Sequence, residues 1–515
     1  MRQAAAVIAV ALLIALPAPI GAQRSLDDAF RVFWSAADRV QAATAAESIA
    51  RLEPSFDAAF QRLRAGRSYA ADVATGVVRG SHEMAGRTFA YSLDVPPAYK
   101  PNVRYQVRFQ LHGGIGRPDP SVRGSGAIGA LAGAEQIYVL PASWDQAPWW
   151  GPAQVDSLAI ILDKVKRTYN VDENRVAVSG VSDGGTGAYY IAMRDTTPYA
   201  SFLPLNGFIM ILANPSLGIR EQLFPNNLHS KPLFVVNGGR DQLYPTSIVE
   251  PYVRHLQSGG VTLTYLPQPE AQHNTAWWPD VKDTFERFVR DHPRDPYPAA
   301  LSWESDQAEA RAHWLRIDRL RPRGVDEPLP DLNEMATRTS PNFGVRAEGM
   351  RITSVIKGSN AEALGLLPGD LIDSVNGRVI PDGVPLLDLL ETIDAGTRIA
   401  LKVKRDASVV ELAGTFQPKS LVNTVSLFRR SRSSGRVDLV RDGNTIRATT
   451  RGVAAFTLLL SPDVFDFSKP VTVVADGRTV FEGVIKKDVA TLMRWAARDN
   501  DRTMLFGAEL PVSVR

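Results

Sequence analysis

The sequence predicts an α/β fold in which a mostly parallel sheet is flanked by helices over residues 76–298. Three apolar runs have the length and composition of strands, at 105–111, 175–179 and 231–236, and each of them ends in a glycine-containing loop. A helix-forming run follows the second of these strands, and a segment with apolar residues at helical spacing closes the region. Strands that alternate with helices in this way are typical of a parallel sheet.

The most informative motif is Gly-Val-Ser-Asp-Gly-Gly at 180–185, where the strand 175–179 gives way to a helix. A serine on so tight a turn needs neighbours without side-chain bulk. Gly180 and Gly184 therefore leave room for the crowded backbone while the Ser182 hydroxyl projects from the turn. This arrangement is typical of a nucleophile elbow, and we expect Ser182 to be a catalytic nucleophile.

The strand 105–111 ends in a His-Gly-Gly-Ile-Gly loop, in which backbone N–H groups can be exposed. In an acyl transfer the carbonyl oxygen becomes an oxyanion, and two preorganised N–H donors stabilise it. We expect these donors to be the N–H of Gly114 or Ile115 together with that of Asp183. We expect His112 to hold the loop in place.

An acid and a base follow in the order that such chemistry requires. Asp241 lies in a glycine-loosened loop beyond the strand 231–236, and we expect it to be the orienting carboxylate. Of the seven histidines, His273 alone combines the right chain order with a loop position before the last helix of the region. Asp280 remains a competitor for the role of Asp241.

The chain order serine, aspartate, histidine is that of the α/β-hydrolases. Residues 91–293 resemble the secreted esterase and depolymerase branch of that family, whose members carry a His-Gly-Gly oxyanion segment. The resemblance implies that His273 takes the proton of Ser182, which attacks an ester or amide carbonyl. It also implies that Asp241 holds the imidazole, that water releases the acyl-enzyme, and that no metal or other cofactor takes part.

An aromatic cluster lies between the oxyanion loop and the nucleophile, at Trp144, Trp149 and Trp150. Aromatic side chains dominate the energetics of cores and of binding sites alike. Two interpretations are therefore open. The cluster lines the substrate cleft, or it packs under a long loop.

Length and composition set the frame for this site. A chain of 515 residues, 44% of them hydrophobic, can form several packed domains. The formal charge of +3 and the absence of a basic tract argue against nucleic acid as a partner. The chain contains no cysteine, which excludes disulfides and a lipid-modified amino terminus.

Residues 1–22 have the pattern of a signal peptide, with Arg2, a short apolar stretch and small residues up to Ala22. The apolar stretch is interrupted by prolines and is short for a bilayer span. We expect cleavage after Ala22, export to the periplasm or the medium, and no membrane association afterwards.

Residues 23–75 are expected to form two helices, with Ser25 and Asp28 spaced like an N-cap pair and a new start at Pro54. This helical hairpin would be a lid or a brace for the hydrolase-like region. Residues 299–338 are expected to form appended strands and a linker.

Residues 339–418 contain Leu-Pro-Gly-Asp-Leu-Ile at 367–372 and Val-Asn-Gly at 375–377, a combination similar to bacterial PDZ domains. The resemblance implies that a peptide adds as a strand beside the sheet edge while loop N–H groups capture its terminal carboxylate. The corresponding loop consists of Asn342, Phe343, Gly344 and Val345. It departs from the commonest Gly-Leu-Gly-Phe pattern, so a purely structural module is the alternative.

Residues 419–515 alternate apolar and polar positions around Asp442-Gly443 and again around Asp476-Gly477, which predicts two β-hairpins. An amphipathic helix is expected near 488–497. Such a β-rich module either binds polymer or packs on the body of the protein, and we favour packing.

Three functions fit these observations. The first is an exported serine hydrolase that cleaves carboxylic esters. The second is an exported serine peptidase of the prolyl-oligopeptidase-like type, in which the PDZ-like domain docks peptides. The third is a non-catalytic scaffold, against which the intact set of Ser182, Asp241 and His273 argues.

Overall fold

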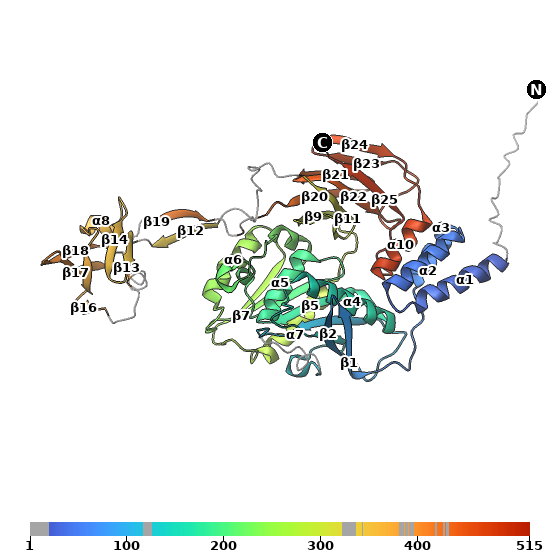
Figure 1. The fold of residues 1–515 in the computed structure, drawn as a ribbon, viewed down its shortest axis with the longest axis horizontal. Helices are drawn as coiled ribbons and strands as arrows, with labels where there is room; N and C mark the ends of the chain where they lie inside the picture. Colours follow the sequence, from blue (N-terminus) through green and yellow to red (C-terminus); the bar gives the residue numbers. More distant parts are fainter. Residues whose placement is uncertain are drawn as a thin grey trace, which may run out of the picture. The chain divides into compact units, whose positions relative to one another are not determined.

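The computed structural model of the chain contains two compact units (Figure 1). The first comprises Met1–Asn333 and Phe428–Arg515, and the second comprises Glu334–Leu427. The residues that the structure describes are 20–116, 126–321, 336–341, 343–380, 386, 390, 396–417, 420–425, 428 and 432–514. Residues 1–19 of the expected signal peptide lie outside this set.

The first unit is built on an eight-stranded sheet of order β1-β2-β4-β3-β5-β6-β7-β8. Strand β2 runs antiparallel to both of its neighbours, and all later neighbours are parallel. This is the predicted α/β-hydrolase fold, which is thereby confirmed. The strands are β1 (Gly76–Met84), β2 (Arg87–Val95), β3 (Tyr105–Leu111), β4 (Ile137–Pro141), β5 (Val171–Val181), β6 (Ser201–Leu205), β7 (Leu233–Gly238) and β8 (Leu263–Gln268).

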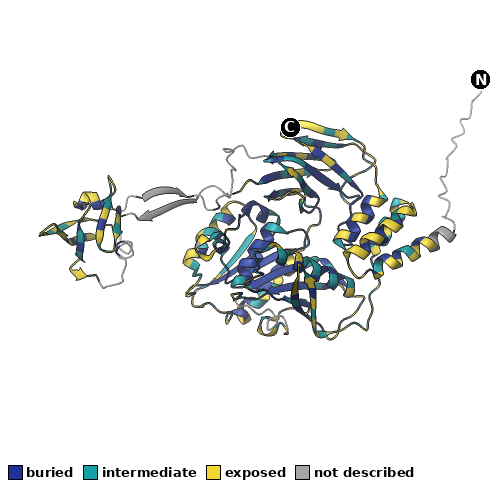
Figure 2. Cartoon of the chain, in the orientation of Figure 1, coloured by how far each residue is buried: buried dark blue, intermediate teal, exposed yellow. Residues whose placement is uncertain are grey.

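Four helices flank the sheet: α4 (Pro152–Thr168), α5 (Asp183–Arg194), α6 (Thr246–Ser258) and α7 (Trp278–Asp291). The central strands are buried along nearly their whole length, as Figure 2 shows. A parallel strand covered by helices is apolar on both faces, which is why these strands read as continuous apolar runs. Phe285 and Phe288 of α7, for example, pack on Phe234 of β7 with ring centroids 5.6 and 5.2 Å apart.

The amino-terminal part forms three helices rather than two: α1 (Ile20–Ser35), α2 (Arg39–Arg51) and α3 (Phe56–Ala65). The extra break is stabilised by the Asp38 carboxylate, which accepts the N–H of Gln41 at 2.9 Å and caps α2. The predicted cap at Ser25 is wrong, because α1 already includes that residue. The three helices share a buried cluster with Leu492 and Met493 of α10 (Val489–Asp499), which favours a brace over a lid.

Strands within 300–320 and 435–513, which come from the segments 299–338 and 419–515 that were expected as separate parts, form one β module. Strands β9 (Ala300–Ser305), β10 (Ala310–Ala312) and β11 (Leu315–Leu320) join sheets of order β24-β23-β21-β20-β9 and β10-β11-β22-β25. The second unit is therefore an insertion between β11 and β20. The remaining strands are β20 (Gly435–Asp442), β21 (Thr445–Arg451), β22 (Val453–Leu460), β23 (Val471–Ala475), β24 (Arg478–Gly483) and β25 (Ala508–Ser513).

Both expected hairpins are present in this module, as β20–β21 and β23–β24. Helix α10 buries Leu492 and Trp495, as its amphipathic pattern predicts. The core between the two sheets is rich in large aromatic side chains, among them Trp303, Trp314 and Phe506.

The second unit has a sheet of order β13-β14-β15-β17-β18, with β16 paired to β15. In it the Asp370 carboxylate accepts hydrogen bonds from Arg405 at 2.8 Å and from the Leu367 N–H at 2.9 Å. The Arg405 hydrogen bonds are the main reason that the pKa of Asp370 lies below its usual range. Its elements are β13 (Val345–Glu348), β14 (Arg351–Val355), α8 (Asn360–Leu364), β15 (Leu371–Val375), β16 (Arg378–Val379), β17 (Arg398–Arg405) and β18 (Ser408–Thr415).

Two further strands of the second unit, β12 (Ala336–Pro341) and β19 (Ser420–Val425), pair antiparallel with each other. Ala336 lies opposite Val425, and Pro341 lies opposite Ser420. The chain that leads into the unit and the chain that leaves it are therefore hydrogen-bonded partners.

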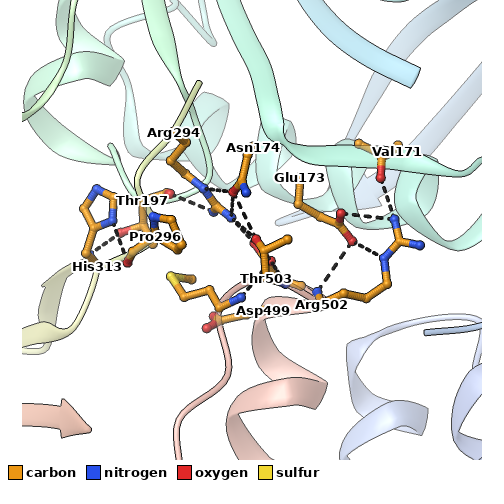
Figure 3. Close-up of polar contacts among 12 residues, drawn as sticks. Val171, Glu173, Asn174, Thr197, Arg294, Pro296, His313, Asp499, Arg502 and Thr503 are labelled. Carbon is orange, nitrogen blue, oxygen red and sulfur yellow. Dashed lines mark hydrogen bonds and ion pairs between the residues drawn. The ribbon is translucent and has the colours of Figure 1, made fainter. Parts of the chain in front are cut away.

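Buried polar contacts join the β module to the base of the large sheet (Figure 3). Arg502, which follows α10, donates to the Glu173 carboxylate of β5 at 2.6 and 3.1 Å and to the Val171 carbonyl at 2.6 Å. Close by, Arg294 donates to Asp501 at 2.7 Å and to Asn174 at 2.9 Å. Both guanidinium groups are buried and paired, which is the condition under which buried charges are tolerated.

A buried histidine lies at the same junction. His313 donates from Nδ1 to the Pro296 carbonyl at 3.2 Å, and its backbone N–H donates to Thr197 at 3.0 Å (Figure 3). Burial, with smaller contributions from the neighbouring Lys231 and Arg294, lowers the pKa of His313 well below its usual range.

We expect Arg502→Met to destabilise the protein by about 3–5 kcal/mol, because Glu173 would be left buried without its cation. The double variant Arg502→Met/Glu173→Met should recover part of this loss, since no unpaired charge remains. Chemical denaturation followed by tryptophan fluorescence measures both. Arg478→Met, at an exposed position of β24, is the control and should change stability by less than about 0.5 kcal/mol. A single variant as stable as the wild type would contradict the assignment.

We expect acid to destabilise the fold partly through His313. In the unfolded chain this histidine titrates at about pH 6.5, whereas in the folded protein it titrates only at much lower pH. Below about pH 6.5 the unfolded state therefore binds more protons than the folded state. Stability is therefore lost as the pH falls, by up to about 2 kcal/mol at pH 5. In His313→Asn, which suits the left-handed backbone there (φ 51°), melting temperature should fall less between pH 7 and pH 5. An unchanged slope would refute this source of acid sensitivity.

Candidate active site

The serine predicted as nucleophile lies between β5 and α5 in a strained backbone conformation, with φ 58° and ψ −118°. Non-glycine residues adopt positive φ rarely and at a cost, so the surroundings must hold it there. The N–H of Ser182 donates to the Leu205 carbonyl of β6 at 2.9 Å. A Cβ on Gly180 would clash with the backbone of Gly184, and one on Gly184 would clash with the Leu111 carbonyl. Glycine at both positions is thus a steric requirement of the elbow.

The structure brings the three predicted residues into one hydrogen-bonded chain. His273 Nδ1 lies 2.6 Å from Asp241 Oδ2, and its Nε2 lies 2.8 Å from Ser182 Oγ. A carboxylate only accepts hydrogen bonds, so Nδ1 carries the proton and donates it. Nε2 is then left as an acceptor for the serine hydroxyl.

The Asp241 carboxylate is fully buried and accepts three hydrogen bonds. Its Oδ1 accepts from the backbone N–H groups of Leu243 and Tyr244 at 2.8 and 2.9 Å, while Oδ2 accepts from His273. Such contacts fix the orientation of the carboxylate. The competitor Asp280 is exposed in the first turn of α7, whereas Asp241 is the carboxylate that contacts His273.

Tyr244 belongs to this site although sequence reasoning missed it. Its ring meets the His273 ring edge-on, with centroids 5.6 Å apart and an interplanar angle of 76°. Burial, together with the carboxylates of Asp183 and Asp241, raises the pKa of Tyr244 to about 12, so its phenol is neutral at physiological pH. The signal in the sequence was its position three residues after the orienting acid.

Asn206 is a second residue that the sequence reasoning missed. It directly follows β6 with φ 48°, is fully buried, and donates from Nδ2 to the Asn274 carbonyl at 2.8 Å. Its backbone N–H also donates to the Val236 carbonyl at 2.7 Å. Asn206 therefore ties the loop that carries His273 to the sheet. Asparagine tolerates left-handed backbone, so an asparagine directly after a strand was the available signal.

His112 holds the loop that follows β3, as expected. Its Nδ1 donates to the Gly113 carbonyl at 3.0 Å, and its Nε2 accepts from the Ser143 N–H at 3.0 Å. Gly113 lies against the nucleophile, because a Cβ there would be 2.8 Å from the Ser182 Cβ. The loop and the elbow are thus in direct contact.

Of the two oxyanion donors considered in this loop, Ile115 is already engaged. Its N–H donates to the Asp183 carboxylate at 3.0 Å, so the expectation for Ile115 is wrong in this conformation. Gly114, the alternative, is exposed and has φ 67°, a conformation that suits glycine. The N–H of Asp183 belongs to the first turn of α5, where helix N–H groups lack intrahelical acceptors.

The tryptophan cluster is packed rather than open. Trp144 is buried against Phe89 with ring centroids 5.2 Å apart, and Trp149 is buried and donates to the His112 carbonyl at 2.8 Å. The cleft interpretation is therefore wrong for both, whereas packing is confirmed. Trp150 is half-buried. Trp149 nonetheless serves the site indirectly, because it supports the loop next to Ser182.

In the second unit the expected peptide-binding loop precedes β13, an edge strand of the described sheet. Phe343 is buried and stacks on Phe416, with centroids 6.2 Å apart. Gly344 has φ 88°, and a Cβ there would clash with the side chain of Ser359. Val345 begins β13, and Asn342 lies outside the described residues.

Within the described part of the chain, no group of three or more histidine, aspartate and glutamate side chains is arranged to hold a metal ion. Nor does any described helix have both the length and the apolar composition needed to cross a membrane.

Comparison with known proteins identifies the second unit. A family model described as PDZ domain matches residues 351–405. This segment is a PDZ domain. A probable periplasmic serine endoprotease, DegP-like, from Chlamydia muridarum (strain MoPn / Nigg) is 37% identical over 67 residues. That match covers 13% of this chain and 14% of the relative, so the chain spans about one seventh of it.

Solved structures align with about two fifths of the chain. A thermostable esterase aligns with 42% of the chain and 63% of its own length, at 18% identity and a TM-score of 0.35. A ferulic acid esterase aligns with 41% of the chain and 97% of its own length, at 18% identity and a TM-score of 0.34. Est1E from Butyrivibrio proteoclasticus aligns with 42% of the chain and 98% of its own length, at 15% identity and a TM-score of 0.32. The assignment of the fold rests on the strand order and not on these alignments.

Proposed function

We propose that this protein is an exported serine hydrolase that cleaves carboxylic esters. The single observation that carries the proposal is the position of His273, with Nδ1 2.6 Å from Asp241 and Nε2 2.8 Å from Ser182. Distances of this size are those at which an imidazole can take a proton from a hydroxyl while a carboxylate orients it.

In the first half-reaction, Ser182 Oγ attacks the ester carbonyl carbon as its proton moves to His273 Nε2. The carbonyl oxygen gains the negative charge, for which the N–H groups of Gly114 and Asp183 are the proposed donors. His273 then gives its proton to the departing alkoxide, and an alcohol leaves. Asp241 stabilises the imidazolium between these two steps.

In the second half-reaction, water attacks the acyl group carried on Ser182 Oγ. His273 takes a proton from the water and returns it to the serine oxygen as the acyl bond breaks. The products are a carboxylic acid and the free enzyme. Neutral Tyr244 beside the imidazole adds no charge to compete with these proton transfers.

Esters are favoured over peptides because the chain carries the His-Gly-Gly segment of the esterase branch and its described catalytic residues are accessible. The side chain of His273 is 18% exposed, Ser182 is half-buried and Gly114 is exposed. A peptidase remains the second candidate, for which the specific observation is the PDZ domain, a module that binds peptides in other proteins. Its similarity to a relative named as a serine endoprotease points the same way.

Export is supported by the signal-peptide pattern of residues 1–22 and by the relative described as periplasmic. Export does not depend on the catalytic proposal. It predicts only that the mature chain begins at Gln23.

We expect Ser182→Ala, His273→Ala and Asp241→Ala each to lower kcat by about 10³-fold or more, because the three side chains act as one unit. Asp280→Ala, at an exposed acid of α7, should keep wild-type turnover. The assay pairs p-nitrophenyl esters with peptidyl anilides, and a fluorophosphonate probe with peptide mapping should label Ser182. Faster anilide than ester turnover would favour the peptidase, and absence of label in wild type would refute both enzymes.

We also propose that the PDZ domain binds the carboxyl terminus of a peptide beside β13. In the full chain, Gly344→Ala should weaken binding by at least about tenfold, because the added methyl group clashes with Ser359. Gly349→Ala is the matched control, since Gly349 also has positive φ but has open space at that position. Fluorescence anisotropy with a library of labelled C-terminal peptides measures both. No binding to any peptide of a diverse library would indicate a purely structural module.

A further inference from the structure

The oxyanion loop and the nucleophile elbow meet mainly through their backbones. Gly113 lies against Ser182, and Gly184 lies against the carbonyls of Leu111 and His112. Van der Waals contact of this kind sets a minimum distance between the two segments, yet it gives little control over the direction of an N–H group. A directional bond is needed for that.

One side chain supplies such a bond across the junction. Asp183, the first residue of α5, accepts the N–H of Ile115 through Oδ2 at 3.0 Å. The Ile115 side chain is itself buried, so this residue is anchored on its apolar side as well. Gly114, directly before it, is exposed and has the left-handed conformation of φ 67°. Glycine has a wide range of accessible backbone conformations, and the fixed peptide group after Gly114 limits that range.

We propose that Asp183 is a positioning residue that aims the Gly114 N–H at the oxyanion by holding the N–H of Ile115. The proposal rests on the hydrolase function proposed above. Asp183 then has two roles. Its backbone N–H is an oxyanion donor, and its carboxylate fixes the loop that carries the other donor.

The charge of this carboxylate opposes the reaction, whereas its hydrogen bond helps it. A negative group near a developing oxyanion raises the energy of the transition state. The Ile115 N–H and the positive N-terminus of α5 offset part of that effect. An asparagine at 183 would keep an acceptor oxygen for Ile115 and remove the charge. The geometric role therefore predicts that Asp183→Asn is nearly harmless and Asp183→Ala is not.

The experiment compares Asp183→Ala, Asp183→Asn and the control Asp280→Ala on a p-nitrophenyl ester, with kcat and KM determined separately. We expect Asp183→Ala to lower kcat by about 10- to 100-fold, with KM changed less than about threefold, because the loss falls on the transition state. Asp183→Asn should recover most of the activity that Asp183→Ala loses, because it keeps an acceptor for the Ile115 N–H, and the control Asp280→Ala should stay within about threefold of wild type. The rate of fluorophosphonate labelling should follow kcat, since the phosphonyl oxygen occupies the same hole.

Two results would overturn the proposal. One is an Asp183→Ala enzyme with kcat within threefold of wild type. The other is an Asp183→Asn enzyme that loses as much as Asp183→Ala, which would mean that the charge matters and the acceptor does not. The melting temperatures of all three variants show whether a loss of activity reflects misfolding, and a loss in Asp183→Ala that Asp183→Asn restores excludes that explanation. Failure of the proposed function differs from both, because the wild-type protein would then neither hydrolyse the ester nor take up the probe.

Discussion

The candidate site depends on close contact between two pieces of backbone. Ser182 adopts a positive-φ conformation that a serine does not favour, and the loop after β3 packs closely against it and against the first turn of α5. Gly113, Gly180 and Gly184 make that approach sterically feasible. A methyl group at any of these glycines would push apart the very segments from which the nucleophile and the oxyanion donors are built. The constraint is steric, because there is no space for a Cβ atom at these three positions.

Strand β5 connects this constraint to the rest of the first unit. Its far end leads to Ser182, and near its beginning Glu173 is clamped by Arg502 from the β module. The amino-terminal helices pack in turn on α10, which directly precedes that arginine. The β module and the amino-terminal helices therefore support the strand that leads to Ser182.

The sequence predicted the α/β-hydrolase fold and the positions of Ser182, Asp241 and His273 because each depends on local signals. A serine between glycines after a strand, and acids or bases in loops after strands, are visible without long-range information. The same holds for the two hairpins, whose Asp-Gly turns are local. Residues that lie in a recognisable turn, or that follow one another in a recognisable order along the chain, were therefore predictable.

What the sequence did not predict depends on contacts between distant segments. The engagement of Ile115 requires knowledge of where the Asp183 side chain points, and the burial of Trp149 requires knowledge of the helix it meets. The pairing of β9 with β20 joins residues 130 or more positions apart, and no local pattern marks it. The extra break after α1 was missed because the cap at Asp38 lies in a run that otherwise favours helix. In each case tertiary contact decided between local alternatives of similar propensity.

The antiparallel pairing of β12 with β19 has a consequence for how such a chain arises. The chain enters the second unit and leaves it as neighbouring strands, which lie about 5 Å apart in any sheet. A cassette that begins and ends on such a ribbon needs only two adjacent attachment points on its host. Evolution can thus gain, lose or exchange the cassette in one recombination event without rethreading the host fold. A tight turn spliced in its place would bridge the same gap.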